Sequence, residues 1–314
     1  MGFIMKKILY FIVIALLLGS CQKIIDISVP DQSRKIVLGS IINSDNLVVV
    51  RLSESKSILE DNDFILLEDA EVKLFEENQY VGTLNYTGSS RYVLPDFYPV
   101  NERTYRIEVN HQVLASVRSE IRIPKTVPIL EIDTSSTISE YGNETYIVNV
   151  KIADPGGEDN FYTLSVAATS RVFDWNTQEL TDSIETHMLY LNSIDEGDPG
   201  IGGELVNQDL NYFIDDKLFV SDALFDGQEH EFSVAIESYF FYGMADTVML
   251  DVRLDHIDPS YYYYSVSKQK YYQADGNPFS EPVQVYNNIE NGFGILSAYA
   301  RASSQYNMII KGEK

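Results

Sequence analysis

Alternating apolar and polar residues recur along most of this chain, and they predict short β-strands. Successive side chains of a strand point to opposite faces, so a period of two indicates one buried face and one solvated face. Residues 70–75 show the pattern clearly, because Val72 and Leu74 fall on the face opposite Glu71. The same pattern, rich in β-branched and aromatic residues, predicts further strands at 36–42, 47–52, 80–86, 92–94, 104–109 and 113–123.

These strands predict that residues 36–124 form one β-sandwich. Seven or so short strands in about a hundred residues are typical of that fold, and the polar segment 43–46 would join the first two strands as a hairpin. The sequences at 70–75 and 103–109 resemble immunoglobulin-like or prealbumin-like modules of bacterial surface proteins. The resemblance implies an immunoglobulin/prealbumin-like β-sandwich.

A second β-rich domain is predicted over residues 125–314. Pro124 and Pro128 disfavour a helix and a central strand, so the segment around them suits a linker or a strand that changes sheets. Residues 170–228 are rich in Asp, Asn and Gly, lack a clear pattern, and are predicted to form a loop insertion with at most a short helix. Strands are predicted on both sides of the insertion, at 144–152, 160–168, 231–239 and 247–257.

One main helix is predicted near residues 258–273, and it is rich in tyrosine. Asp258 is a good N-cap, Pro259 suits the first helical position, and residues 275–278 contain the glycine and proline that end a helix. A stripe of this kind is more often a packing surface with a polar rim than a platform for a ligand. With 3.6 residues per turn, the residues that share one face are Tyr261, Tyr264, Lys268 and Tyr272.

The N-terminal residues resemble the signal of a bacterial lipoprotein. Two lysines precede an uncharged apolar segment that has the length of a secretory signal and is too short for a comfortable membrane span. It ends in Leu-Gly-Ser-Cys, which resembles the lipobox whose cysteine is acylated and becomes the first mature residue. The resemblance implies a signal peptide at 1–20, lipid attachment at Cys21 and an anchor linker at 21–35. An ordinary signal peptide with a chance cysteine is the alternative.

A lipid on Cys21 would hold the protein at a membrane, since no later segment approaches the roughly eighteen apolar residues of a membrane span. Cys21 is the only cysteine, so no disulfide is expected. Aspartate is absent from the position after Cys21, which favours sorting to the outer membrane. Whether the protein faces the periplasm or the cell surface stays open.

The chain is strongly acidic, with 47 Asp and Glu against 23 Lys and Arg and a formal net charge of −24. Removal of the signal would take away two lysines and no acid, which leaves 21 basic residues and a net charge of −26. A polyanion repels nucleic acid and anionic lipid headgroups. The charge therefore excludes nucleic acid as a partner. Solubility is its simplest interpretation, and a cationic ligand is the alternative.

No motif has the spacing of a catalytic or cofactor site. The four histidines are scattered, and the chain lacks a nucleotide-binding loop, a nucleophile elbow and a zincin pattern. We therefore expect no enzymatic activity and no organic cofactor. A glycosidase needs only two carboxylates, so composition alone does not remove that class.

A structural calcium ion is the stronger of the acid-based hypotheses. Asp195, Glu196 and Asp198 place several oxygen ligands on a loop that contains glycine, and residues 154–159 do the same. Neither segment fits the EF-hand template. A solvated acidic turn is the commoner outcome for such a sequence.

The last third of the chain carries the most specific resemblance. The segment 256–264 with its tyrosine run, the segment 277–283 and the segment 287–296 resemble the DUF4249 family of Bacteroidota lipoproteins, and the resemblance extends over essentially the full length. Members of that family are frequently encoded beside outer-membrane TonB-dependent receptors. The resemblance thus implies a role in nutrient capture or uptake, and it offers no catalytic residues to transfer.

Two functional hypotheses follow. The first is an outer-membrane lipoprotein that acts as a non-enzymatic binding or accessory partner of a TonB-dependent nutrient transporter. The second is a structural or adhesive surface lipoprotein whose sandwiches act as spacers, and a carbohydrate-active enzyme is a distant third. A spacer would need neither the 170–228 insertion nor the tyrosine-rich helix, which favours the first. The expected contact surface comprises Trp175, which is equally compatible with a core position, Tyr212, Tyr261, Tyr262, Tyr263 and Tyr264.

Overall fold

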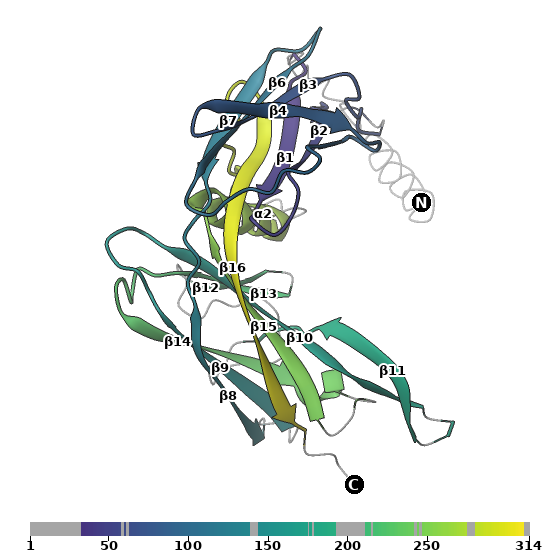
Figure 1. Ribbon diagram of the computed structural model, residues 1–314, viewed down its shortest axis with the longest axis vertical. Helices are drawn as coiled ribbons and strands as arrows, with labels where there is room; N and C mark the ends of the chain where they lie inside the picture. The colour runs from purple at the N-terminus through teal and green to yellow at the C-terminus, as the bar shows by residue number, and fades with distance from the viewer. Residues whose placement is uncertain are drawn as a thin grey trace, which may run out of the picture. The chain divides into compact units, whose positions relative to one another are not determined.

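The protein is mainly β, with 57% strand and 9% helix, as the sequence predicted. Among the described residues, no helix is both long and apolar enough to cross a membrane. The predicted signal peptide, Cys21 and nearly all of the anchor linker lie outside these residues. The computed structural model (Figure 1) describes residues 33–57, 60, 63–138, 144–174, 176–177, 179–192, 211–214, 216–241, 244, 247–274 and 280–310.

Seven strands from residues 36–122 form the first β-sandwich. One sheet joins β1, β2, β5 and the end of β4, and the other joins β4, β3, β6 and β7. Val72 and Leu74, which the sequence placed on one face, are fully buried between the sheets, whereas Glu71 is exposed. The strands are β1 (Ile36–Ile42), β2 (Val49–Glu54), β3 (Glu71–Glu76), β4 (Gln79–Tyr86), β5 (Arg91–Val93), β6 (Thr104–Asn110) and β7 (Val117–Arg122).

A second sandwich lies in the rest of the chain. Its smaller sheet has the order β14-β9-β8, and its larger sheet has β12-β13-β10-β15-β16, with β11 paired to β10. Val150 of β9 and Val234 of β14 are fully buried against Val166 of β10 and Val252 of β15, which places a core between the sheets. The elements are β8 (Ile129–Ile138), β9 (Glu144–Ala153), β10 (Phe161–Asp174), β11 (Glu179–Met188), β12 (Asn211–Ile214), β13 (Lys217–Ser221), β14 (Glu229–Glu237), the short 3₁₀ helix η1 (Ser238–Phe241), β15 (Thr247–Ile257) and β16 (Phe293–Ile309).

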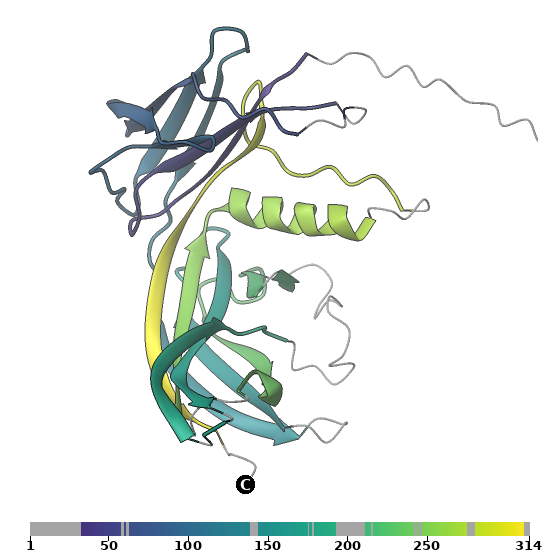
Figure 2. The same cartoon turned by 90° about the vertical axis from the view of Figure 1, so that its right-hand side faces the viewer.

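The long strand β16 belongs to both sandwiches. Its first residues pair in parallel with β1, from Val37↔Phe293 to Ile42↔Ala298, and its later residues pair antiparallel with β15. Figure 2 shows this strand, in yellow, running from the first sandwich along β15. Gly294 permits the close approach to β1, because its φ is +111° and a Cβ there would lie 2.0 Å from the carbonyl oxygen of Leu38. The last strand thus completes a sheet begun by the first.

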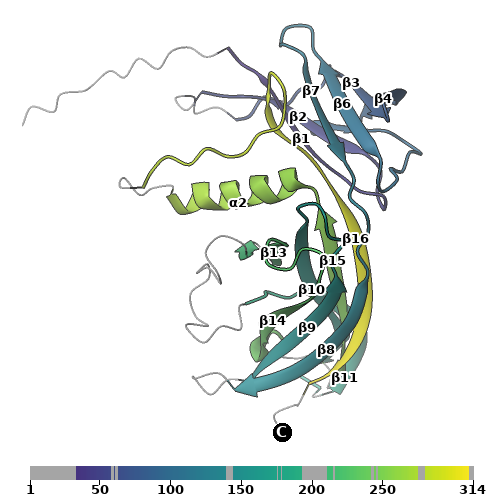
Figure 3. The same cartoon turned by 90° about the vertical axis from the view of Figure 1, so that its left-hand side faces the viewer.

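The predicted helix is α2 (Pro259–Ala274), and it covers one end of the second sandwich. Tyr262 and Val266 pack on the apolar side chains of Phe161 from β10 and Phe219 from β13. The N-cap works as predicted, since the backbone N–H of Ser260 donates to Asp258 Oδ2 at 2.8 Å. The helix lies beside the extended segment that leads from it to β16, as Figure 3 shows.

The structure differs from the predicted organisation in two respects. Residues 170–228 contain the end of β10, all of β11, and the strands β12 and β13, so the described part of this segment is largely β-structure and not loop. The boundary near 124 marks a change of sheet between β7 and β8, but the first sandwich is not confined to 36–124 because β16 pairs with β1. The connection at 154–159 joins β9 and β10, which lie in different sheets.

Candidate ligand-binding pocket

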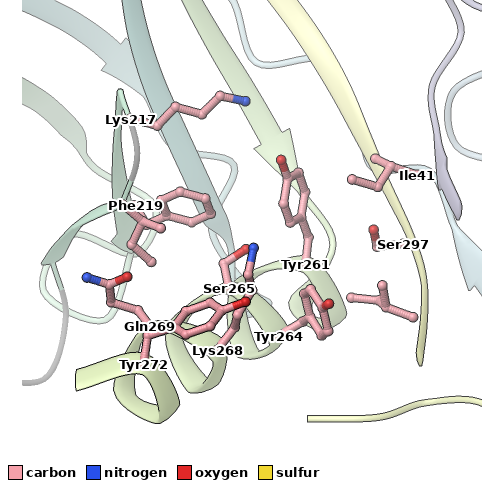
Figure 4. A pocket seen from close by; sticks show the side chains of 12 residues that line it. Ile41, Lys217, Phe219, Tyr261, Tyr264, Ser265, Lys268, Gln269, Tyr272 and Ser297 are labelled. Carbon is pink, nitrogen blue, oxygen red and sulfur yellow. The ribbon is translucent and has the colours of Figure 1, made fainter. Parts of the chain in front are cut away.

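A cavity of about 280 Å³ lies against one face of α2 (Figure 4). That volume is slightly below the usual range of about 300–1,000 Å³ for small-molecule sites. Three parts of the fold line the cavity: the helix α2, the pair β12 and β13, and the paired strands β1 and β16. The lining residues are Ile41, Ile214, Lys217, Phe219, Tyr261, Tyr264, Ser265, Lys268, Gln269, Tyr272, Ile295 and Ser297.

The helix contributes the face that its sequence predicted. Tyr261, Tyr264, Lys268 and Tyr272 all line the cavity, because residues three and four apart project from one side of a helix. The neighbouring tyrosines have other roles. Tyr262 is 5% exposed and its ring packs in a tilted arrangement on Phe161 in the core, and Tyr263 is 46% exposed.

The opposite wall follows from the alternation of side chains along β16. Leu296 and Ala298 are fully buried in the core of the first sandwich, so the residues that alternate with them point to the other face. That face carries Ile295 and Ser297 into the cavity, and Ile41 joins them because it pairs with Ser297 across β1 and β16. The parallel pairing of the first and last strands therefore builds part of the site.

Ser297 is the most unusual residue of this wall. Its side chain is fully buried, yet its hydroxyl oxygen has no hydrogen-bond partner among the described residues. Buried polar groups in proteins are almost always satisfied, and leaving one unsatisfied costs about 1–3 kcal/mol. The oxygen itself has almost no accessible surface, so a bound molecule could reach it only if the neighbouring side chains moved.

The described side chains of the cavity carry a charge opposite to that of the protein. Of its twelve described lining residues, Lys217 and Lys268 are basic and none is acidic, although the chain carries a net charge of −24. In Figure 4 the nitrogen of Lys268 lies between Phe219 and Tyr261, and the side chain of Lys217 runs above both rings. The ammonium group of Lys268 also lies 5.8 Å from the ring centre of Tyr272.

These side chains suit binding. Aromatic rings and isoleucines offer apolar contact, the lysines offer positive charge, and the hydroxyl of Ser297 and the amide of Gln269 offer hydrogen bonds. The lining residues in the described part of the chain include no histidine, cysteine or carboxylate. Catalytic pairs that depend on histidine, cysteine or two carboxylates are therefore not among them.

A cluster of three carboxylates lies elsewhere, in the second sandwich. The ligand atoms of Asp154, Asp222 and Asp226 are within 4.8 Å of one another, and among the described residues no other group of three potential metal ligands is as close. Asp154 accepts hydrogen bonds from the hydroxyl of Tyr162 at 2.5 Å and from the backbone of Gly227 at 2.8 Å. Burial raises the pKa of Asp222, and the charges of Asp154 and Asp226 raise it further.

This cluster links the connection between β9 and β10 to the turn between β13 and β14. Only Asp154 comes from the segment 154–159, where the sequence suggested calcium; Glu158 and Asp159 are exposed. Asp222 and Asp226 could not be assigned to it from the sequence, because they lie about seventy residues further along the chain.

Several other predicted site residues lie outside the described part of the protein. Trp175 and the predicted calcium ligands Asp195, Glu196 and Asp198 are among them. Tyr212 belongs to β12, but its side chain is not described. The contact role of these residues and the calcium site stay predictions.

The sequence did not reveal which residues form the walls of the cavity opposite the helix. Lys217, Phe219 and Ser297 lie in strands that were not predicted, and only the fold brings them to the tyrosine-rich helix. The resemblance at 287–296 ends just before Ser297, so it drew attention to the neighbouring residues without assigning them a role.

Comparison with known proteins gives a family and an attachment site. A family profile described as "Domain of unknown function (DUF4249)" matches residues 22–305. A profile for the prokaryotic membrane lipoprotein lipid attachment site matches residues 5–22, which include Cys21. No curated protein matches the chain.

Proposed function

Because this chain belongs to the DUF4249 family and carries a lipoprotein attachment site, we propose that it is a nutrient-binding accessory lipoprotein of the outer membrane. Acyl chains on Cys21 hold it at the membrane. It binds a small molecule in the α2 pocket and delivers it to a TonB-dependent transporter. Its role is to bind, and it catalyses no reaction.

The pocket is the observation that carries this proposal. It combines aromatic surface, two lysines and the unpaired buried hydroxyl of Ser297 in one cavity of about 280 Å³. A protein that served only as a spacer would gain nothing from an unsatisfied polar group beside a cavity, since such a group lowers stability. A bound ligand would supply the missing partner.

The location and the partner rest on separate support. The sequence after Cys21 lacks the aspartate that would disfavour sorting to the outer membrane. The resemblance to lipoproteins encoded beside TonB-dependent receptors supports the transporter as partner. A lipid anchor would keep the pocket close to a transporter in the same membrane.

Purification of the tagged lipoprotein from its native outer membrane tests the partnership. We expect a TonB-dependent receptor to co-purify under mild detergent and to be absent when cells with the untagged lipoprotein are processed in the same way. Recovery of the lipoprotein without any receptor, after chemical crosslinking of intact cells, would contradict the partnership.

A variant that fills the cavity tests the role of the pocket. Gln269→Trp places a large ring in the cavity from a helix position that is only partly buried, and we expect it to slow receptor-dependent growth on limiting nutrient. Gln273→Trp is the matched control, because Gln273 is exposed on the same helix and does not line the cavity. Equal growth of both variants would remove the pocket from the proposed function.

The spacer hypothesis keeps one structural argument. Since β16 is continuous through both sandwiches, it joins them by a strand and not by a linker, as a stiff support would require. Under that hypothesis surface attachment or adhesion would depend on the sandwiches, and both tryptophan variants would behave like the wild type.

A further inference from the structure

We propose that the α2 pocket selects a small organic anion, with a flat apolar or aromatic body and one carboxylate or similar group. The inference rests on the proposed function, because it takes the pocket as the ligand site. It adds the chemical class of the ligand, which neither the family nor the lipid anchor supplies.

The apolar body is inferred from the walls. Phe219 projects from β13, Tyr261 and Tyr264 project from α2, and Ile295 contributes an aliphatic surface from β16. Flat rings of a ligand stack well on such surfaces, and burial of apolar area supplies most of the binding free energy. The volume of about 280 Å³ suits one small ring system, so an oligosaccharide or a peptide would not be enclosed.

The anionic group is inferred from the lysines. A buried carboxylate needs a cationic or hydrogen-bonding partner, and Lys217 and Lys268 both line the cavity. Lys268 forms no ion pair with any of the described residues, so its charge is not neutralised by the protein. In a chain with net charge −24, a wall on which Lys268 has no described ion-pair partner and no described lining residue is acidic is the local exception that lets an anion enter.

A further polar atom on the ligand is inferred from Ser297. Its buried hydroxyl can donate one hydrogen bond and accept others, and none is made within the described structure. Figure 4 shows Ser297 on the side of the cavity opposite Phe219, next to Tyr264. A hydroxyl or carbonyl group on the body of the ligand would satisfy it there once the neighbouring side chains gave access to it.

Isothermal titration of the purified full-length lipoprotein, in detergent and with a detergent blank, tests the charge requirement. The probes are indole-3-acetate and indole-3-acetamide, which share a ring and differ in the negative charge. We expect the acetate to bind at least about tenfold more tightly, because a hydrogen bond to a charged group is stronger than one to a neutral group. Equal affinities would overturn the proposal, as would tighter binding of a neutral sugar such as maltose.

Lysine variants identify the source of the selectivity. Lys268→Met keeps most of the side-chain volume and removes the charge, so we expect about a tenfold loss for the acetate and little change for the acetamide. Lys270→Met is the control, since Lys270 lies on the same helix, is exposed and does not line the cavity. Thermal unfolding of each variant establishes that it is folded. Identical losses in the two variants would overturn the assignment to Lys268.

The two proposals fail in different ways. If Gln269→Trp slows growth but indole-3-acetate does not bind the wild type, the ligand class is wrong and the pocket keeps its role. If the acetate binds and depends on Lys268 while Gln269→Trp cells grow normally, the pocket binds anions and the proposed role in nutrient uptake is wrong.

Discussion

At the scale of single residues, Asp258 connects the helix to the shared strand. One carboxylate oxygen caps α2 through the N–H of Ser260, and the other accepts the N–H of Ala298 in β16 at 2.7 Å. Burial raises the pKa of Asp258 to about 6 from an ordinary value of 3.8, and the hydrogen bonds that it accepts offset part of the rise. The folded protein therefore holds this proton more tightly than the unfolded chain does.

This difference predicts the sign of a pH dependence. The contribution of Asp258 to stability is full below pH 3.8, falls as pH rises toward about 6, and is constant above that value. A difference of about two pKa units corresponds to about 3 kcal/mol. Asparagine does not titrate, so we expect the Asp258→Asn variant to lack this fall in stability. Its free energy of unfolding relative to that of the wild type should therefore rise between pH 4 and pH 6. Denaturant unfolding across that range measures it, and parallel curves for the two proteins would contradict it.

Gly294 is the residue whose substitution should be least tolerated. An alanine there would bring its Cβ within 2.0 Å of the Leu38 carbonyl oxygen and would have to adopt a φ of +111°. We expect Gly294→Ala to cost at least about 3 kcal/mol, or to prevent folding, since both backbone strain and steric overlap act together.

Gly39 offers the matched control for Gly294. It lies in β1, the strand that faces Gly294, but a Cβ at Gly39 would meet no atom within 4 Å. Gly39→Ala should change the free energy of unfolding by less than about 1 kcal/mol. Similar unfolding midpoints for the two alanine variants would show that close packing against β1 is not the constraint.

At the scale of elements, one ion pair fastens β15 to β16. Arg301 donates from Nε and Nη2 to the two oxygens of Asp255 at 2.6 and 2.8 Å, and the two residues face each other across the strands. The carboxylate of Asp255 is 1% exposed. Loss of the arginine would leave that charge buried without a partner.

We expect Arg301→Ala to destabilise the protein by about 3–5 kcal/mol. The double variant Asp255→Leu with Arg301→Leu should be closer to wild type, because neither charge then remains buried alone. A double-mutant cycle from denaturant unfolding checks the difference. If the double variant were less stable than Arg301→Ala, the cost of the unpaired charge would not be the dominant effect.

The elements also show which patterns allow prediction. Strands with one buried and one solvated face, such as β1 and β6, were located closely because their alternation follows the period of a strand. β11 was missed because it is exposed on nearly all positions and so shows no alternation. β16 was missed because residues 295–298 are buried on both faces, between the first core and the helix, and the period of two disappears there.

The site was predictable only where a local periodicity groups its residues. The face of α2 follows from helical spacing alone, so Tyr261, Tyr264, Lys268 and Tyr272 could be grouped before any fold was known. The separation of Tyr262 from that group also follows from spacing, but its burial depends on Phe161 in a distant strand. Lys217 and Ser297 could not be added, because tertiary pairing and not local pattern brings them to the helix.

At the scale of the whole molecule, Cys21 is the residue on which we expect membrane attachment to depend. We expect Cys21→Ala to abolish lipidation and to leave the protein in the soluble fraction or unprocessed, since the attachment site includes this cysteine. Membrane fractionation with metabolic labelling by a palmitate analogue measures both effects. If the variant stayed with the membrane through a high-salt and carbonate wash, either another anchor or a partner would hold it.

The pairing of β1 with β16 also bears on the order in which the protein can fold. A chain that is synthesised and exported from its N-terminus presents Val37 early and its partner Phe293 almost last. Until then, the edge of β1 would have unpaired backbone groups, which are a template for wrong association. Contacts between such distant segments also slow folding. We therefore expect the first sandwich to stay incomplete until β16 is available, and protection of the β1 edge during that time to favour correct folding.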